Sequence, residues 1–158
     1  MDNRRTARLL NSLERLVPQV NKQLPSEESW RAGGWFSVAD MGTQRELIES
    51  NCIRVGRFLG ERECKEALAH SMENMELLIN HQELVTSRAD RTDGSGLRGG
   101  AIRAGRYILS FSGFTEFWDE ALILYIALLD RLLSEDDLRQ MAAPGVLALC
   151  NKIAITPI

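Results

Sequence analysis

The stretch from Phe114 to Leu133 constrains the fold of this chain more than any other. Its central run, Ala121–Leu129, has no polar face when it is drawn as a helix. A helix that is apolar on all sides is buried by other elements and does not lie on a surface. Thr115 is well placed to cap its start, and acidic residues follow in the opening turns, where the helix dipole favours negative charge. We therefore expect a buried helix over about 116–133, covered by amphipathic neighbours.

The chain has 158 residues, which is enough for a sizeable core, and we expect a single helical domain over 1–158. Three widely spaced cysteines form no disulfide framework and indicate a reducing compartment. The N-terminus lacks the apolar core of a signal peptide, and the Ala121–Leu129 run is far shorter than the ~18 residues of a membrane span. These features predict a cytoplasmic protein without a membrane span.

Apolar residues recur at helical spacing along most of the remaining chain. We expect helices over about 9–20, 43–59 and 61–85, a short helix from Ser134 and a last helix from Pro144. Pro18 should end or kink the first of these helices. The capping box Thr43-Gln44-Arg45-Glu46 opens the second, and Gly60 is well placed to cap its end.

Two segments are less clear. Residues 25–42 contain glycines and two tryptophans, Trp30 and Trp35, and we expect a loop that these aromatic side chains pin to the core. The segment 101–111 suits either a helix or a strand. No second strand candidate is apparent to pair with it, so we interpret it as a helix. The resulting fold class is all-α: a single-domain helical bundle of six to seven helices around the buried apolar helix.

The segment just before that helix, residues 88–106, has an unusual composition. It contains five arginines and two aspartates, so it carries +3 while the rest of the chain carries −6. The planar guanidinium of arginine suits bidentate contacts to phosphate or carboxylate, and five glycines allow the backbone to approach a ligand closely. We expect an anionic partner here, RNA or DNA first, bound by Arg88, Arg91, Arg98, Arg103 and Arg106.

Other interpretations of this segment stay open. It could bind a small anionic ligand, or the arginines could pair with acids of the same chain, candidates being Asp90, Asp93, Glu116, Asp119 and Asp136. The run Gly94–Gly99 matches the dinucleotide-binding spacing G-x-G-x-x-G, but it lacks a preceding strand and a βαβ unit. No phosphate-loop motif is present in the sequence.

Few residues suggest catalysis. Glu66, His70 and Glu73 share one helical face, with His81 nearly on the same side, and we interpret this face as solvated, with weak Glu–His pairs. The cysteines lie on apolar stripes, where a thiol acts as a small hydrophobe. No His/Cys cluster has zinc-ligand spacing. We expect no metal and no cofactor, and we favour a non-enzymatic protein over an enzyme that uses His70 or a cysteine (Cys52, Cys64 or Cys150).

The piece Gly105–Phe111, GRYILSF, is similar to the first homology motif of Bcl-type apoptosis regulators, although Ala104 stands where that family usually has tryptophan. The resemblance implies an all-α, helix-in-groove module that binds a partner protein. It would make Arg106 a contact to an acid of the docked helix, with a groove lined by Val55, Phe58 and Leu59. This is the alternative to our first hypothesis, a self-associating interaction protein with an anionic partner at residues 88–106.

Overall fold

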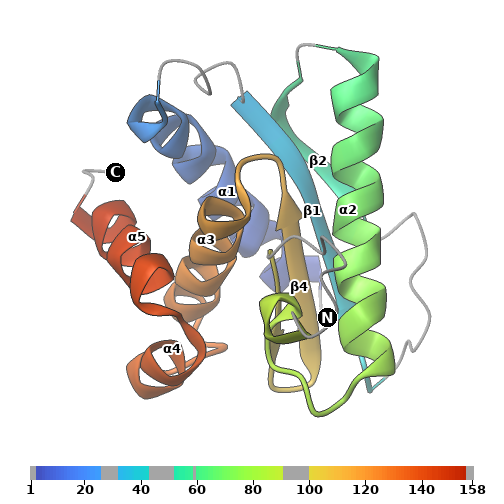
Figure 1. Ribbon diagram of the computed structural model, residues 1–158, viewed down its shortest axis with the longest axis vertical. Coiled ribbons are helices and arrows are strands. Elements are labelled where there is room, and N and C mark those ends of the chain that lie inside the picture. The colour runs from blue at the N-terminus through green and yellow to red at the C-terminus, as the bar shows by residue number, and fades with distance from the viewer. Residues whose placement is uncertain (1–2, 26–31, 43–51, 59, 91–99, 156–158) are drawn as a thin grey trace.

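The computed structural model describes residues 3–25, 32–42, 52–58, 60–90 and 100–155, which form an antiparallel sheet with helices on both faces (Figure 1). The strands are β1 (Ala32–Asp40), β2 (Cys52–Arg57), β3 (Ala101–Ala104) and β4 (Tyr107–Ser112), in the spatial order β2-β1-β4-β3. The helices are α1 (Asn3–Gln23), α2 (Glu61–Asn80), α3 (Glu116–Leu129), α4 (Glu135–Met141) and α5 (Pro144–Ile155), with a short 3-10 helix over Ser87–Asp90.

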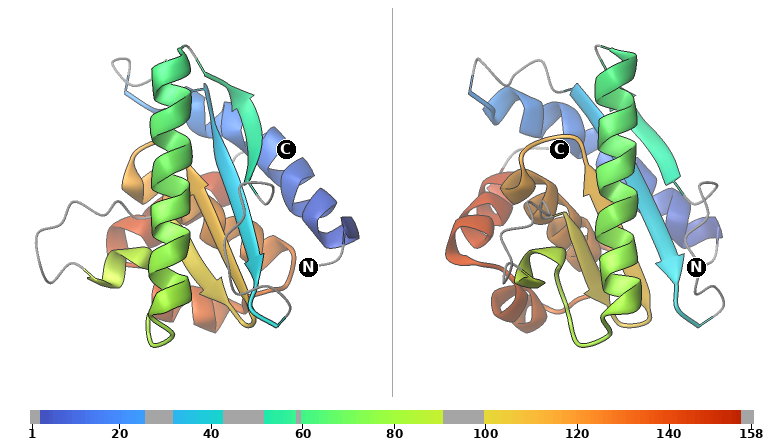
Figure 2. Two further views of the ribbon diagram at one scale, coloured as in Figure 1. Left: turned by 90° about the vertical axis from the view of Figure 1, so that its right-hand side faces the viewer. Right: turned by 45° about the vertical axis from the view of Figure 1, so that its right-hand side comes forward.

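The sheet separates two hydrophobic clusters, because successive residues of a strand point to opposite faces. On one face Ala39 and Ile108 of the sheet pack against Met75 and Leu78 of α2. On the other face the sheet packs against α1 and α3, and α5 packs against α3. Figure 2 shows α2 lying along the sheet on the side opposite to α1. The chain therefore has three layers, with the sheet in the middle.

The predicted all-α bundle is wrong, since a four-stranded sheet occupies the centre of the molecule. Residues 101–111, which we expected to be helical, form the hairpin β3–β4, in which Ala104 pairs with Tyr107. Gly105, in the two-residue loop, has φ +60°, the left-handed conformation that such a loop favours. The partner strand that we did not find in the sequence is β1, which lies in the expected loop 25–42 and pairs with β4 from Trp35↔Ser112 to Asp40↔Tyr107.

The glycines of β1 kept us from predicting this strand, because glycine is not typical of strands. Close packing requires them at these positions. A Cβ on Gly34 would lie 2.4 Å from the ring of Phe111 and 2.5 Å from the carbonyl oxygen of Ser112. Glycine inside a strand often marks such a close approach. Trp35, by contrast, is held as expected: it is half-buried, and its indole Nε1 donates to the carbonyl oxygen of Cys64 at 2.9 Å. Trp30 lies outside the described residues.

The expected helix over 43–59 is also corrected in the part that the structure describes. Residues 52–57 form β2, an edge strand paired with β1, and Gly60 precedes α2 instead of ending a helix. Over so short a run the apolar residues fit both periods, because Cys52 and Val55 have helical spacing, whereas Ile53 and Val55 alternate as on one face of a strand. The capping box over 43–46 lies outside the described residues.

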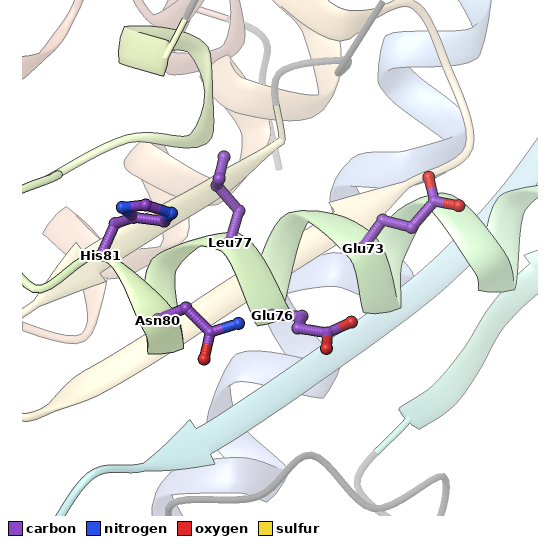
Figure 3. A pocket seen from close by; sticks show the side chains of 5 residues that line it. All are labelled: Glu73, Glu76, Leu77, Asn80 and His81. Carbon is purple, nitrogen blue, oxygen red and sulfur yellow. The ribbon is translucent and has the colours of Figure 1, made fainter. Parts of the chain in front are cut away.

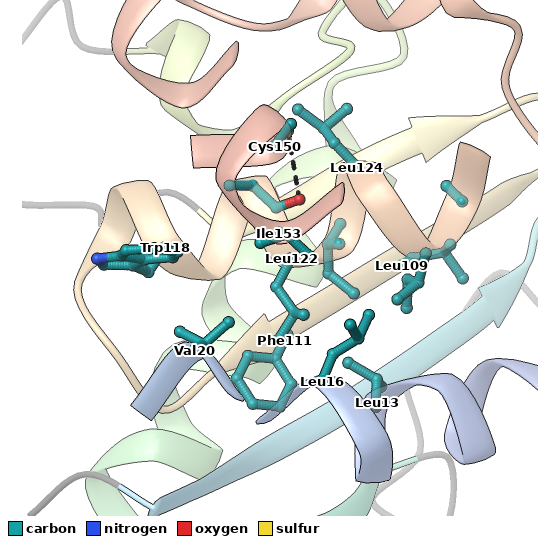
Figure 4. Packing of buried hydrophobic residues seen from close by; sticks show 14 of the residues in the cluster. Leu13, Leu16, Val20, Leu109, Phe111, Trp118, Leu122, Leu124, Cys150 and Ile153 are labelled. Carbon is teal, nitrogen blue, oxygen red and sulfur yellow. Dashed lines mark hydrogen bonds between the residues drawn. The ribbon is translucent and has the colours of Figure 1, made fainter. Parts of the chain in front are cut away.

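The buried apolar helix is confirmed as α3, although it ends at Leu129, before the expected end near 133, and Leu129 itself is exposed. Leu122, Ile123, Leu124 and Ile126 are completely buried. Figure 4 shows that α3 lies between α5 and the sheet, with Leu13, Leu16 and Val20 of α1 reaching the same core. The expected last helix is confirmed as α5, and α4 begins with a capping box in which Ser134 and Asp137 bond reciprocally. No helix among the described residues combines the length and apolar character that a membrane crossing requires.

Helix α1 continues through Pro18 to Gln23, so the expected end at this proline is not observed. Proline removes one backbone donor, which would otherwise bond the carbonyl four residues earlier. Pro18 is exposed, so water can reach that side of the helix. On the opposite side Leu13, Leu16 and Val17 are buried in the core, and this packing holds the helix together across the proline.

Candidate nucleic-acid interface

Arg88 lies in the 3-10 helix before the glycine-rich segment and binds α3. Its Nε donates to Glu120 Oε2 at 2.8 Å and its second nitrogen donates to Oε1 at 3.1 Å. The Glu120 side chain is fully buried, and that of Arg88 is 20% exposed. The hydrogen bond to Glu120 raises the pKa of Arg88, so the guanidinium stays charged. Both groups of this bidentate pair are therefore committed to holding the 3-10 helix on α3.

Arg103 lies on β3 and faces α2. Its guanidinium donates to the carbonyl oxygens of Leu78 and His81, at the end of α2, and to that of Leu84. The last carbonyls of a helix lack partners within the helix, and a cation is favoured there by the dipole. Burial lowers the pKa of Arg103. This arginine satisfies the end of α2 and is not presented to solvent as a free cation.

Arg106 lies in the β3–β4 loop and pairs with Asp40 at the end of β1. The Arg106 nitrogen lies 2.9 Å from Asp40 Oδ2, and the guanidinium lies 5.1 Å from the ring centroid of Tyr107. Burial by itself raises the pKa of Asp40. Hydrogen bonds and nearby positive charge, including that of Arg106, lower this pKa by more, so it lies below its usual value. The Arg106 side chain remains 59% exposed.

The described arginines of the segment 88–106 do not converge on one surface. Arg88 contacts α3, Arg103 contacts the end of α2, and Arg106 contacts β1. These contacts follow the interpretation in which the arginines pair within the chain, although with partners that we had not named. Arg91 and Arg98 lie outside the described residues.

A different set of cations lies in line along α1. This helix carries five cations and one glutamate, and it belongs to a chain with a formal net charge of −3. With 3.6 residues per turn, positions 4, 8, 15 and 22 fall within about 40° of one another around the helix axis. All four are exposed, whereas the residues on the opposite side are buried in the core. We call this line of side chains the α1 stripe; it consists of Arg4, Arg8, Arg15 and Lys22.

Three members of the α1 stripe have no carboxylate partner among the described residues: Arg4, Arg15 and Lys22. The fourth, Arg8, binds Asp130 at 2.7 Å and keeps 58% of its side chain exposed. Arg5, beside the stripe, lies 2.9 Å from the other oxygen of Asp130. The carboxylate of Asp130 is 8% exposed, so one largely buried acid anchors two arginines at this end of α1. We did not predict the stripe, although its spacing of four, seven and seven residues is visible in the sequence.

Helix α2, on the opposite face of the sheet, is acidic. Helix α2 contains five glutamates against one arginine and one lysine. Its C-terminal half has a shallow, open depression lined by Glu73, Glu76, Leu77, Asn80 and His81 (Figure 3). All of these come from α2 and the residue after it, so no second element contributes to the lining. His81 is exposed and lies 3.2 Å from Glu83.

The enzyme hypothesis depends on His70 or a cysteine. Among the described residues no three His, Cys, Asp or Glu side chains are grouped as a metal site would need. Cys150 is buried and its thiol donates to the carbonyl of Ala121, while Cys52 and Cys64 are half-buried. Desolvation by burial, with the charge of Glu120 as a smaller cause, raises the pKa of Cys150 to about 12. Such a thiol is a poor nucleophile at neutral pH.

The fold contradicts the Bcl-type resemblance. The family's fold is all-α, whereas GRYILSF forms a turn and a central strand of the sheet. Arg106 binds Asp40 of the same chain, and Val55 is buried in β2. The Phe58 ring lies tilted against that of Trp35 at a ring-centroid distance of 6.5 Å, and Leu59 lies outside the described residues.

Comparison of the chain with protein-family models, curated proteins and solved structures gave no match.

Proposed function

We propose that this protein is a non-enzymatic binding protein whose anionic partner, RNA or DNA, docks on the α1 stripe. The observation that supports the proposal is the alignment of Arg4, Arg8, Arg15 and Lys22 on one exposed face, with three of them unpaired in the described part of the chain. Our first hypothesis placed this function at residues 88–106. The internal contacts of Arg88 and Arg103 favour moving it to α1.

The side chains beside the stripe favour nucleic acid over a protein partner. The other exposed residues of α1 are Ala7, Asn11, Glu14 and Pro18, none of which is a large apolar side chain. Stable protein interfaces have an apolar or aromatic centre that excludes water. Binding to a phosphate backbone needs no such centre, because release of counterions supplies most of the affinity.

The test is binding of a fluorescently labelled oligonucleotide, followed by anisotropy at low salt. We expect the variant Arg4→Ala/Arg15→Ala/Lys22→Ala to lose affinity by at least about tenfold, because each phosphate contact releases a counterion. A matched control is Arg62→Ala/Lys65→Ala/Arg139→Ala. It removes three cations that are paired to glutamates or an aspartate on α2 and α4.

Both triple variants have the same formal net charge, three below the −3 of the parent chain. A difference between them therefore reports where the charges lie and not how many there are. If the parent binds no oligonucleotide at low salt, or if both variants weaken binding equally, the α1 stripe is not a nucleic-acid site.

A further inference from the structure

We infer that the α1 stripe recognises the phosphate backbone of a double-stranded nucleic acid, in preference to single strands and without regard to sequence. The inference rests on the proposed function and names the form of the nucleic acid. It follows from what the stripe contains, from what it lacks and from how α1 is held.

The stripe lacks the side chains that single-strand binders use. Proteins that bind single strands without sequence preference stack bases on aromatic side chains. Helix α1 has no aromatic residue at all. The described aromatic side chain with the greatest exposure, Phe117, lies in α3. A stripe of cations with no stacking surface gains nothing from unpaired bases.

The stripe is also held firmly in place. Leu9, Leu13 and Val20 are at most 1% exposed, which fixes α1 on the sheet along its length. From position 4 to position 22 the helix advances roughly 27 Å, at 1.5 Å per residue. This length corresponds to roughly eight base pairs of duplex axis, at 3.4 Å each. Because each strand winds around the axis, a straight row of cations lies beside the phosphates that flank a groove and not beside every phosphate of one strand. A duplex is stiff over this length, so the fixed cations meet phosphates in fixed positions with little loss of conformational freedom.

Charge density favours the same partner. A duplex carries one negative charge per roughly 1.7 Å of axis. The rest of the chain is acidic, but α2 lies on the far side of the sheet. The stripe is much closer to a docked row of phosphates than these acids are, and salt screens the more distant charges, so the local attraction exceeds the repulsion. Helix α1 exposes only one face, because its other face is buried. Phosphate contacts carry no direct sequence information, so we expect binding that does not depend on sequence.

The experiment compares labelled 24-base-pair DNA duplexes of two unrelated sequences, a duplex RNA of the same length and the corresponding single strands, from 25 to 300 mM NaCl. We expect both DNA duplexes to bind with equal affinity within about twofold and to bind more tightly than either single strand. The slope of log K against log salt should be about −3, from the three unpaired cations. It should flatten by about 1 for each of Arg4→Ala, Arg15→Ala and Lys22→Ala.

The outcomes separate this inference from the proposed function. Tighter binding to single strands that still depends on the α1 stripe would overturn the duplex preference and leave the proposed function standing. Absence of binding to every oligonucleotide would overturn both. Sedimentation velocity of the free protein at the same salt provides a further check, because self-association that is abolished by the α1 triple variant would assign the stripe to a second copy of the chain.

Discussion

Arg88 donates two hydrogen bonds to the carboxylate of Glu120, and that carboxylate has no exposed surface. The pair joins the 3-10 helix, which precedes the glycine-rich segment, to the buried helix α3. A buried carboxylate that loses its counter-charge must either remain ionised without a partner or take up a proton, and both are unfavourable.

We therefore expect Arg88→Ala to destabilise the protein by about 3 kcal/mol or more, measured by urea unfolding. The variant Arg88→Met/Glu120→Met should recover much of this loss, because replacing both charges by apolar groups leaves no unpaired ion. An Arg88→Ala variant with the stability of the parent would show that the pair does not hold these elements together in solution.

Arg103 should stabilise the end of α2 in particular. Arg103→Ala removes donors from the carbonyl groups of Leu78 and His81, so we expect a loss of about 1–2 kcal/mol. Hydrogen exchange should increase in the last turn of α2 more than in its first turns. Arg106→Ala is the comparison: the side chain is more than half exposed, and its loss should leave α2 exchange unchanged. Uniform acceleration throughout the protein would count against a local role.

Cys150 should resist thiol reagents until the protein unfolds. With a pKa of about 12, about one thiol in ten thousand is ionised at pH 8. The variant Cys52→Ser/Cys64→Ser isolates this thiol, and we expect no reaction with a disulfide reagent in buffer and full reaction in urea. Rapid labelling of the folded variant would contradict the burial of Cys150.

The same thiol makes stability depend on alkaline pH. The folded state keeps the proton up to about pH 12, whereas the unfolded chain loses it near the ordinary thiol pKa of 9.0. Between these values the unfolded state binds fewer protons, so the free energy of unfolding falls as pH rises. Cys150→Ala should show a shallower decline than the parent between pH 9 and 11, measured as urea unfolding at each pH. Parallel curves would exclude this thiol as a source of the decline.

Two glycines should respond in opposite directions to the same substitution. Gly34→Ala puts a methyl group against the Phe111 ring and the Ser112 carbonyl, and we expect a loss of at least about 2 kcal/mol. Gly145 lies in the first turn of α5, and a methyl group added there would meet no atom within 4 Å, so Gly145→Ala should gain about 0.5–1 kcal/mol. Thermal melts of both variants test this, and destabilisation by Gly145→Ala would mean that its surroundings are more crowded.

The sequence predicts the long helices that are present, because their apolar residues repeat over several turns, but it also led us to expect helices where β2, β3 and β4 lie. The run Ala121–Leu129 lies in α3, and the periodic leucines of residues 9–20 lie in α1. The strands could not be found in the same way. β3 has four residues, and β1 contains two glycines that are explained by neighbours remote in sequence, the backbone of β2 for Gly33 and the ring of Phe111 for Gly34. A strand without a visible partner was then interpreted as a helix.

The charged residues of the candidate site also differ in how far the sequence predicts them. Composition drew attention to five arginines near the glycines, but whether an arginine is free depends on carboxylates and carbonyls that the fold brings to it, such as Glu120 for Arg88. The alignment of the α1 stripe requires no such knowledge, although the pairing of Arg8 with Asp130 does. Its charges share one face because of helical spacing alone, so the polar residues of α1 predict it as directly as the apolar residues predict the buried face.

The sheet lies between a basic helix, α1, and an acidic helix, α2, so positive and negative charge are separated across the molecule. The chain carries a net negative charge, yet we expect the opposite charges of α1 and α2 to turn α1 toward an approaching polyanion and α2 away from it. Such orientation would take effect before contact. Because the sheet keeps α1 and α2 apart, their opposite charges do not pair with each other.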